Sequence, residues 1–243
     1  MADNPTRTLY GRRRGKALRR GRRNVLTRLL PQLQISPDDL GVGALDPAGL
    51  FGPDVRAVWL EVGFGAGEHL AAMAKAHPDI GFLGCEPFIN GVARLLVDVE
   101  ELGLSNIRIV VDDAGLLLDR LALASIERAF LLFPDPWPKR RHNRRRFIGQ
   151  ENIQAMARVL TDGAHWRMAT DHMDYCRWML DHMTGSQEFE WLARRPGDWR
   201  RRPDDWPPTR YEGKGIEAGR PPAFLTFQRR KRHQMAQVSR GTL

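Results

Sequence analysis

Cysteine is scarce in this chain of 243 residues, which contains only Cys85 and Cys176. Two isolated cysteines provide neither a disulfide framework nor the ligand spacing of a zinc site, so no metal is expected. No apolar run is long enough to span a membrane, and the N-terminal stretch lacks the apolar core of a secretory signal. We therefore expect a cytoplasmic protein without a membrane partner, either a monomer or a homodimer.

Acidic residues are almost absent from residues 1–28, which carry ten basic side chains and one acid, Asp3. The rest of the chain holds 28 basic and 28 acidic residues, so the net charge of +9 comes from this arm. A basic arm on a neutral body indicates a polyanionic partner, although a solvated tail is the alternative. We expect a flexible arm (1–28), a single domain (29–233) and a C-terminal tail (234–243).

Short apolar runs alternate with amphipathic stretches after residue 55. Strands are expected at 57–62, 80–86, 107–113, 127–133, 164–170, 188–193 and 223–229. Helices are expected at about 66–77, 89–102, 115–122, 146–159 and 172–183. The first five strands are continuously apolar, as buried parallel strands are, and the last two have no clear helix between them. The pattern predicts an α/β fold with a doubly wound, mostly parallel, seven-stranded sheet and an antiparallel edge.

The segment 194–215 is rich in proline, glycine, arginine and tryptophan and shows no helical or strand periodicity. A loop of this length inside a compact domain is usually functional or disordered. Trp199 and Trp206 argue against simple disorder. We expect a long loop that contacts the substrate.

Glycines 63, 65 and 67 follow the first expected strand, within the sequence EVGFGAG. Glycine permits a tight turn and a close approach of the backbone to a ligand. Residue 68 is Glu where a dinucleotide-binding loop has glycine, and a P-loop is absent. A purely structural strand–turn–helix junction is the alternative.

Acidic residues lie at the ends of the first three expected strands. Glu61 precedes the glycine loop, Glu86 ends the second strand, and Asp112 and Asp113 end the third. Glu86 could accept both hydroxyls of a ribose, and the aspartates could accept the exocyclic amine of an adenine. Three successive strands that each end in an acid suit a pyrophosphate poorly, but they suit an adenosine-containing ligand with a cationic centre, such as S-adenosylmethionine.

The fourth expected strand runs into the sequence FPDPWPKRRHNRRRF (133–147). Asp135 is held between two prolines, and Trp137 follows, where it could stack on a base or belong to the core. Six cations come next: Lys139, Arg140, Arg141, Arg144, Arg145 and Arg146. Such a density is unusual for a solvated turn. We expect the cations to bind RNA phosphates and Asp135 to serve the chemistry, with a turn residue as its alternative.

Six segments together resemble one known family. They are LEVGFGAG (60–67), GCEPF (84–88), DDA (112–114), FPDPWPKRRHNRRRF (133–147), ATD (169–171) and TRYEGKG (209–215). The pattern is similar to the tRNA (guanine-N7)-methyltransferases, which modify the variable-loop guanine at position 46. The resemblance implies the Rossmann-like fold of class I methyltransferases, S-adenosylmethionine as cofactor and tRNA as partner.

The resemblance also implies roles for single residues. Its cofactor-binding positions match Glu61, Glu86, Asp113 and Asp135, to which the glycine loop adds Gly63 and Gly65. Its substrate-binding positions match Lys139, Asp171, Thr209, Arg210, Tyr211 and Glu212. Asp135 matches the catalytic position. Pro87 and Phe88 depart from the short polar or β-branched pair expected after Glu86, and this departure concerns the contact of Glu86 with the ribose, not the activity.

The chemistry of guanine N7 agrees with these roles. N7 is an acceptor without a proton to remove, so methyl transfer to it needs alignment rather than a general base. Asp135 could stabilise the positive charge that grows on the base or orient the methionyl amine. Asp171 and Glu212 could accept N1–H and the amino group of guanine, although a helix N-cap is an alternative for Asp171.

Two other functions fit parts of the pattern. The Pro-Asp-Pro-Trp sequence loosely resembles the Asx-Pro-Pro-aromatic motif of enzymes that methylate exocyclic amines, but residue 137 is Trp instead of the second proline. A catalytically silent RNA-binding module is the third interpretation. The presence of all four acids at the cofactor positions argues against it.

Overall fold

Seven strands form one sheet in the computed structural model, which describes residues 10–35 and 43–232. The strands are β1 (Ala57–Val62), β2 (Ile80–Cys85), β3 (Ile107–Val110), β4 (Ile126–Leu132), β5 (Leu160–Thr170), β6 (Phe189–Trp191) and β7 (Ala223–Arg229). Their order is β3-β2-β1-β4-β5-β7-β6. Strand β7 runs antiparallel to β5 and β6, and the other neighbours are parallel. The predicted mostly parallel sheet with an antiparallel edge is confirmed.

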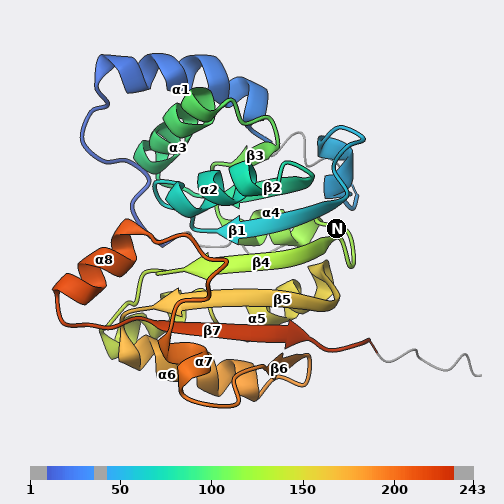
Figure 1. Ribbon diagram of the computed structural model, residues 1–243, viewed down its shortest axis with the longest axis vertical. Coiled ribbons are helices and arrows are strands. Elements are labelled where there is room, and N and C mark those ends of the chain that lie inside the picture. Colours follow the sequence, from blue (N-terminus) through green and yellow to red (C-terminus); the bar gives the residue numbers. More distant parts are fainter. Residues whose placement is uncertain (1–9, 36–42, 233–243) are drawn as a thin grey trace, which may run out of the picture.

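Helices cover both faces of the sheet (Figure 1). They are α1 (Arg20–Leu33), α2 (Glu68–Ala76), α3 (Ile89–Leu102), α4 (Ala114–Arg120), α5 (Gln150–Val159), α6 (Met173–Thr184), α7 (Gly197–Arg200) and α8 (Arg210–Glu217), with 3-10 helices η1 (Pro47–Leu50) and η2 (Arg140–Arg145). The core beneath α1, α2 and α3 is separate from the core beneath α4, α5 and α6. The fold therefore has three layers.

Strand β1 shows why the parallel strands are apolar throughout. Val58, Leu60 and Val62 belong to the core beneath α4–α6, while Trp59 belongs to the core beneath α1–α3. Side chains alternate between the faces of a strand, so a strand covered on both faces needs apolar residues at successive positions. Glu61 breaks this rule and lies buried at 3% exposure on the side of Trp59.

The N-terminal arm differs from the expected flexible segment. Helix α1 begins at Arg20, crosses the expected boundary at residue 28 and packs on α3 with its apolar side chains Val25, Leu26, Leu29, Leu30 and Leu33. These apolar residues recur at helical spacing among the arginines, and this explains why a charge-rich segment folds onto the body. Residues 1–9 and the expected tail, 234–243, lie outside the described residues.

Two further segments differ from their predictions. The loop expected over 194–215 contains α7 and the beginning of α8, and Trp206 anchors it in the core at 3% exposure. The helix expected from residue 146 begins at Gln150, because the arginine-rich stretch before it forms η2. Across the described ranges, every helix is too short or too polar to cross a bilayer.

Candidate active site

The chain turns from β1 into α2 through three glycines in the left-handed region. The φ angles of Gly63, Gly65 and Gly67 are 70°, 58° and 79°, which residues with a Cβ rarely adopt. The turn also approaches α3, since a Cβ on Gly91 would lie 2.0 Å from the carbonyl oxygen of Gly65. Glycine is therefore needed on both sides of the contact, and the backbone of the turn is open to a ligand.

Glu86 follows β2 and holds this turn in place. Its carboxylate accepts hydrogen bonds from the backbone N–H of Gly65 at 2.7 Å and of Phe88 at 2.9 Å. The residue is 8% exposed, and burial raises the pKa of its carboxyl group above the ordinary value. Each oxygen keeps a second lone pair for a ligand hydroxyl.

A cavity of about 650 Å³ opens at the carboxyl ends of β1, β2 and β4 and reaches the loop after β3. Nine predicted site residues line it: Gly63, Gly65, Glu86, Asp113, Asp135, Arg144, Arg145, Arg146 and Tyr211. Its volume lies within the range of small-molecule and cofactor sites. The fold thus gathers the glycine loop, three acids and an aromatic residue from distant parts of the sequence around one space.

The acids after β3 belong to the turn that begins α4, because β3 ends at Val110. Asp113 caps α4 and accepts a hydrogen bond from the N–H of Gly115 at 2.7 Å. Asp112 accepts one from the guanidinium of Arg13 at 3.1 Å. Both aspartates line the large cavity. The N-terminal segment is therefore bound to the cavity's acidic wall.

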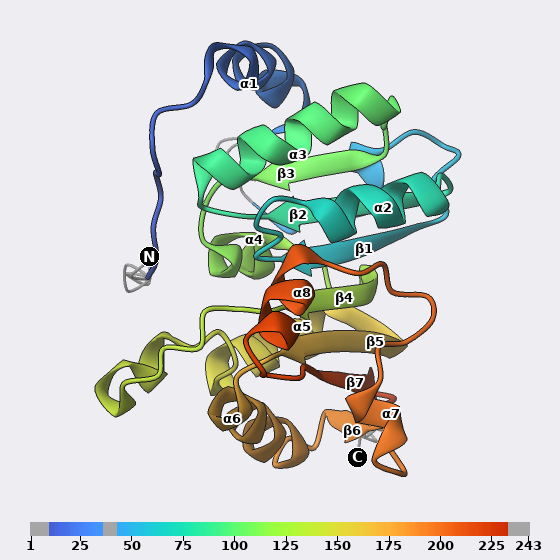
Figure 2. The ribbon, with the colours of Figure 1, turned by 60° about the vertical axis from the view of Figure 1, so that its left-hand side comes forward.

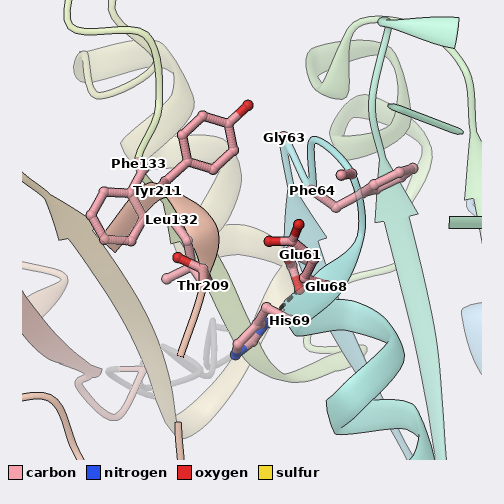
Figure 3. A pocket seen from close by; sticks show the side chains of 10 residues that line it. Glu61, Gly63, Phe64, Glu68, His69, Leu132, Phe133, Thr209 and Tyr211 are labelled. Atoms are coloured by element: carbon pink, nitrogen blue, oxygen red, sulfur yellow. Dashed lines mark hydrogen bonds and ion pairs between the residues drawn. The ribbon is translucent and has the colours of Figure 1, made fainter. Parts of the chain in front are cut away.

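Glu61 faces a second, smaller cavity of about 20 Å³, which is room for about one water molecule. The two cavities share Gly63, Leu132, Phe133 and Tyr211, so they are adjacent. Figure 3 shows Glu61 pointing toward His69, whose Nδ1 lies 2.6 Å from a carboxylate oxygen. Both side chains are buried. His69, to which the sequence assigned no role, is thus the partner of a predicted cofactor residue.

The loop after β4 has an unusual backbone. Phe133 and Trp137 have φ angles of 52° and 43°, in the left-handed region that residues other than glycine rarely occupy. Such conformations cluster at functional sites, where the surrounding structure enforces them. Between them, Asp135 is exposed and has no hydrogen bond or ion pair to another described residue. Asp135 lines the large cavity.

Trp137 lies half-buried on the wall of the large cavity. Its ring meets that of His142 edge to face, with centroids 6.0 Å apart. The guanidinium of Arg145 lies 5.0 Å from the centroids of both Trp137 and Tyr10. Trp137 is therefore a residue of the site rather than of the core.

The predicted cation cluster divides into three groups. Lys139, Arg140, Arg141 and Arg144 are exposed, and Arg145 is half-buried between its two aromatic partners. In Figure 2 the segment of η2 projects from the body on the side along which the N-terminal segment runs. Arg146 is 5% exposed and paired with Asp174. The predicted RNA contact of Arg146 stays a prediction; the residue lines the large cavity, but its guanidinium is enclosed by protein groups.

The residues expected to recognise the base have protein partners. The carboxylate of Asp171 lies 2.9 Å from Arg220, and that of Glu212 lies 3.1 Å from Arg202. The N-cap of α6 is His172 rather than Asp171. Neither acid lines the two cavities described above.

The other residues of this group join α8 to the glycine loop. Thr209 caps α8, and its hydroxyl accepts a hydrogen bond from the N–H of Glu212 at 3.2 Å. Arg210 donates from its backbone N–H to Glu68 at 3.2 Å. Tyr211 lines both cavities and is 43% exposed. The beginning of α8 therefore lies at the site, although residues 209–215 show no helical periodicity.

Comparison with known proteins agrees with this architecture. A family described as "Putative methyltransferase" matches residues 55–225. The chain is 48% identical over 235 residues to a tRNA (guanine-N(7)-)-methyltransferase of Rhodospirillum rubrum, which covers 96% of this chain and 92% of that protein. A protein of the same name from Ruegeria pomeroyi is 48% identical over 231 residues, with 93% and 96% covered. The chain belongs to the tRNA (guanine-N7)-methyltransferase family.

Solved structures support the fold of this tRNA (guanine-N7)-methyltransferase family member. The aminoglycoside resistance methyltransferase NpmB1 superposes with a TM-score of 0.51 at 14% identity, with 81% of this chain and 94% of that chain covered. At this identity the likeness shows the fold alone. The Rossmann-like fold of class I methyltransferases, expected from the sequence motifs, is confirmed.

Three features of this tRNA (guanine-N7)-methyltransferase family member were not predicted from the sequence. Residues 10–12 line the large cavity, His69 pairs with Glu61, and Arg146 is buried. Tyr10 carried a usable signal, because it is the single aromatic residue among residues 1–28. The other two depend on contacts between separate elements, and no local pattern indicates them.

Proposed function

We propose that this protein transfers a methyl group from S-adenosylmethionine to N7 of guanine in tRNA, and that the target is the variable-loop guanine at position 46. Identity of 48% to tRNA (guanine-N(7)-)-methyltransferases over nearly the whole chain supports the reaction. The motif resemblance supports the position. The observation that carries the proposal is Asp135, an exposed carboxylate between two prolines at the acid-lined cavity.

The large cavity fits an adenosine-containing cofactor with a positive centre. Glu86 would accept the ribose hydroxyls, Asp113 would face the adenine amine, and Glu61 would accept from the methionyl amino group. The open backbone of Gly63 and Gly65 would allow close contact. S-adenosylmethionine supplies an electrophilic methyl group on its sulfonium. The acids around the cavity would offset that positive charge, because a charge removed from water is unfavourable unless an opposite charge lies near it.

Asp135 would act by electrostatics. Guanine N7 carries a lone pair and no proton, so its attack on the methyl group releases none. The base becomes positively charged as the bond forms, and a fixed carboxylate stabilises that charge more in the transition state than in the ground state. The prolines on both sides of Asp135 limit the movement of its backbone.

Exposed cations would hold the tRNA over this carboxylate. Lys139, Arg140, Arg141 and Arg144 follow Asp135 within nine residues and are exposed. Arg145 adds a guanidinium at the rim of the cavity. The exposed arginines of α1 and the segment before it extend the positive surface. Phosphate contacts of this kind position the RNA without reading its sequence.

Recognition of guanine would involve an exchange of partners. Guanine presents N1–H and an amino group on its Watson–Crick edge, and a carboxylate accepts both. We propose that Asp171 or Glu212 takes this role, in which case Arg220 or Arg202 must release the carboxylate. Adenine lacks this pair of donors, so it would leave the carboxylate without a partner, at a cost of roughly 1–3 kcal/mol or more.

One experiment tests the reaction directly. Bulk tRNA without modifications is incubated with the protein and S-adenosylmethionine carrying a labelled methyl group, and the labelled nucleoside is then identified. We expect 7-methylguanosine, located at position 46 by chain cleavage at the modified base. Label in N2-methylguanosine would point to an exocyclic amine instead, and absence of label would point to a silent RNA-binding module.

A further inference from the structure

Arg146 is the exception within the arginine-rich segment. The four cations from Lys139 to Arg144 are exposed, whereas Arg146 is 5% exposed. A guanidinium carries five N–H donors and keeps its charge in proteins. Burying it is unfavourable unless protein groups accept those hydrogen bonds and balance the charge. The groups that contact the buried guanidinium of Arg146 therefore indicate its role.

These contacts connect α6 with the loop that carries Asp135. The Nε of Arg146 donates to the carbonyl oxygen of Pro136 at 2.9 Å. One Nη donates to the carboxylate of Asp174, and that bond holds the pKa of Asp174 below its ordinary value. The guanidinium lies 5.0 Å from the ring centroids of both Tyr175 and Trp178. One side chain thus connects the carbonyl group of Pro136, the residue after Asp135, to three residues of a helix.

The Asp135 loop (residues 133–137) needs such support. Its two end residues, Phe133 and Trp137, have positive φ angles, and strained backbone of this kind persists only where other contacts enforce it. Both prolines lack an N–H, which reduces the number of possible anchors. Within the described ranges the loop has two hydrogen-bonded anchors: the N–H of Phe133 donates to Ala169 at 2.8 Å, and the carbonyl of Pro136 accepts from Arg146.

We propose that Arg146, which lines the large cavity with almost all of its surface buried, is a positioning residue that holds Asp135 in place. It does this through the Pro136 carbonyl, and it makes no contact with RNA. The inference rests on the proposed methyl transfer, in which Asp135 must lie at a defined place relative to the base. A displacement of about 1 Å in such a group can lower the rate by about a hundredfold.

Lysine at this position separates the two roles. Arg146→Lys keeps the positive charge, so a residue that bound phosphate would keep much of its affinity for tRNA. Lysine has no planar fork with which to donate to Pro136 and Asp174 at once, and it cannot lie flat between two rings. A positioning residue would therefore fail in this variant.

The test compares Arg146→Lys with Arg144→Ala, which removes an exposed cation two residues away. For each protein we would measure kcat, cofactor affinity, the salt dependence of tRNA binding and hydrogen exchange at the backbone amides of Phe133, Asp135 and Trp137. We expect Arg146→Lys to lower kcat by about ten- to a hundredfold and to speed exchange in the loop. Its cofactor affinity and salt slope should match those of the wild type, whereas Arg144→Ala should lower the slope by about 0.9.

Two results would overturn the proposal: a lower salt slope in Arg146→Lys, or wild-type kcat and exchange in that variant. If Arg146→Lys does not fold, Asp174→Asn decides, because it removes the ion pair and leaves the arginine. We expect a smaller loss of kcat in the same direction and faster loop exchange; wild-type values would contradict the inference. If the wild type does not methylate tRNA, the proposed function has failed, and loop exchange still tests the position of Arg146.

Discussion

The active-site cavity joins two regions of opposite charge that differ in how the chain builds them. The acidic region takes Glu86, Asp112, Asp113 and Asp135 from the ends of three different strands. The basic region comes from the continuous stretch Lys139–Arg145, and the exposed arginines of α1 and of the segment before it extend it. Sheet topology thus assembles the proposed cofactor site, whereas the proposed tRNA surface comes from segments that are each continuous in the sequence. The two should therefore fail independently when mutated.

The largest effect is expected at the point where the regions meet. Asp135→Ala should lower kcat by about a hundredfold or more, the scale of losing one electrostatic contact to the transition state. Asp135 makes no described hydrogen bond or ion pair, so thermal stability should change little. Single-turnover kinetics and thermal unfolding would measure both. Turnover close to the wild type would exclude the assigned role.

A change in the acidic region should affect the cofactor and not the RNA. Glu86→Gln replaces one carboxylate oxygen with an NH2 group that cannot accept, so the side chain can keep only one of its hydrogen bonds from Gly65 and Phe88 and loses acceptor sites for a ribose hydroxyl. Hydrogen bonds to a charged group contribute about 1.5–3 kcal/mol, so cofactor affinity should fall by roughly ten- to a hundredfold. Calorimetry would measure the affinity. Equal losses of tRNA and cofactor affinity would show that the two regions are not independent.

A change in the basic region should have the opposite pattern. Arg19, Arg20 and Arg22 are exposed at the beginning of α1, and their replacement by glutamine should weaken tRNA binding and lower the salt slope by up to about 0.9 for each lost phosphate contact. Cofactor affinity should be unchanged. Binding titrations at several salt concentrations would show this. Substitution is preferable to deletion of residues 1–28, because Tyr10–Arg12 line the cavity and α1 packs on α3.

The smallest effect should be seen with pH. Burial raises the pKa of Glu86 above 4.5, and only the ionised carboxylate accepts hydrogen bonds with both oxygens. As the pH falls through this raised pKa, cofactor affinity should decline by up to about tenfold per pH unit. In Glu86→Gln the dependence should be flatter. An identical pH profile in both proteins would assign the titration to another group.

The sequence predicted the acidic region better than the basic one. Short apolar runs located β1, β2, β4 and β7 within one residue at either end, and the acids that follow β2 and β4 lie together at the cavity. Helix α1 was not predicted, because its apolar residues at helical spacing lie among many arginines. The burial of Arg146 could not be predicted, because its partners on α6 follow 28 to 32 residues later in the chain. Local sequence patterns predict helices and strands, whereas contacts between those elements decide which arginine is buried and which is exposed.

The most direct measurement of the central claim uses a tRNA with a single altered atom. A transcript carrying 7-deazaguanosine at position 46 replaces N7 with a C–H group and keeps the Watson–Crick edge and the phosphates. The proposed function predicts that this tRNA binds with wild-type affinity and receives no methyl group, while the guanosine transcript is methylated. Methylation of the 7-deaza transcript would contradict transfer to N7 of that guanine.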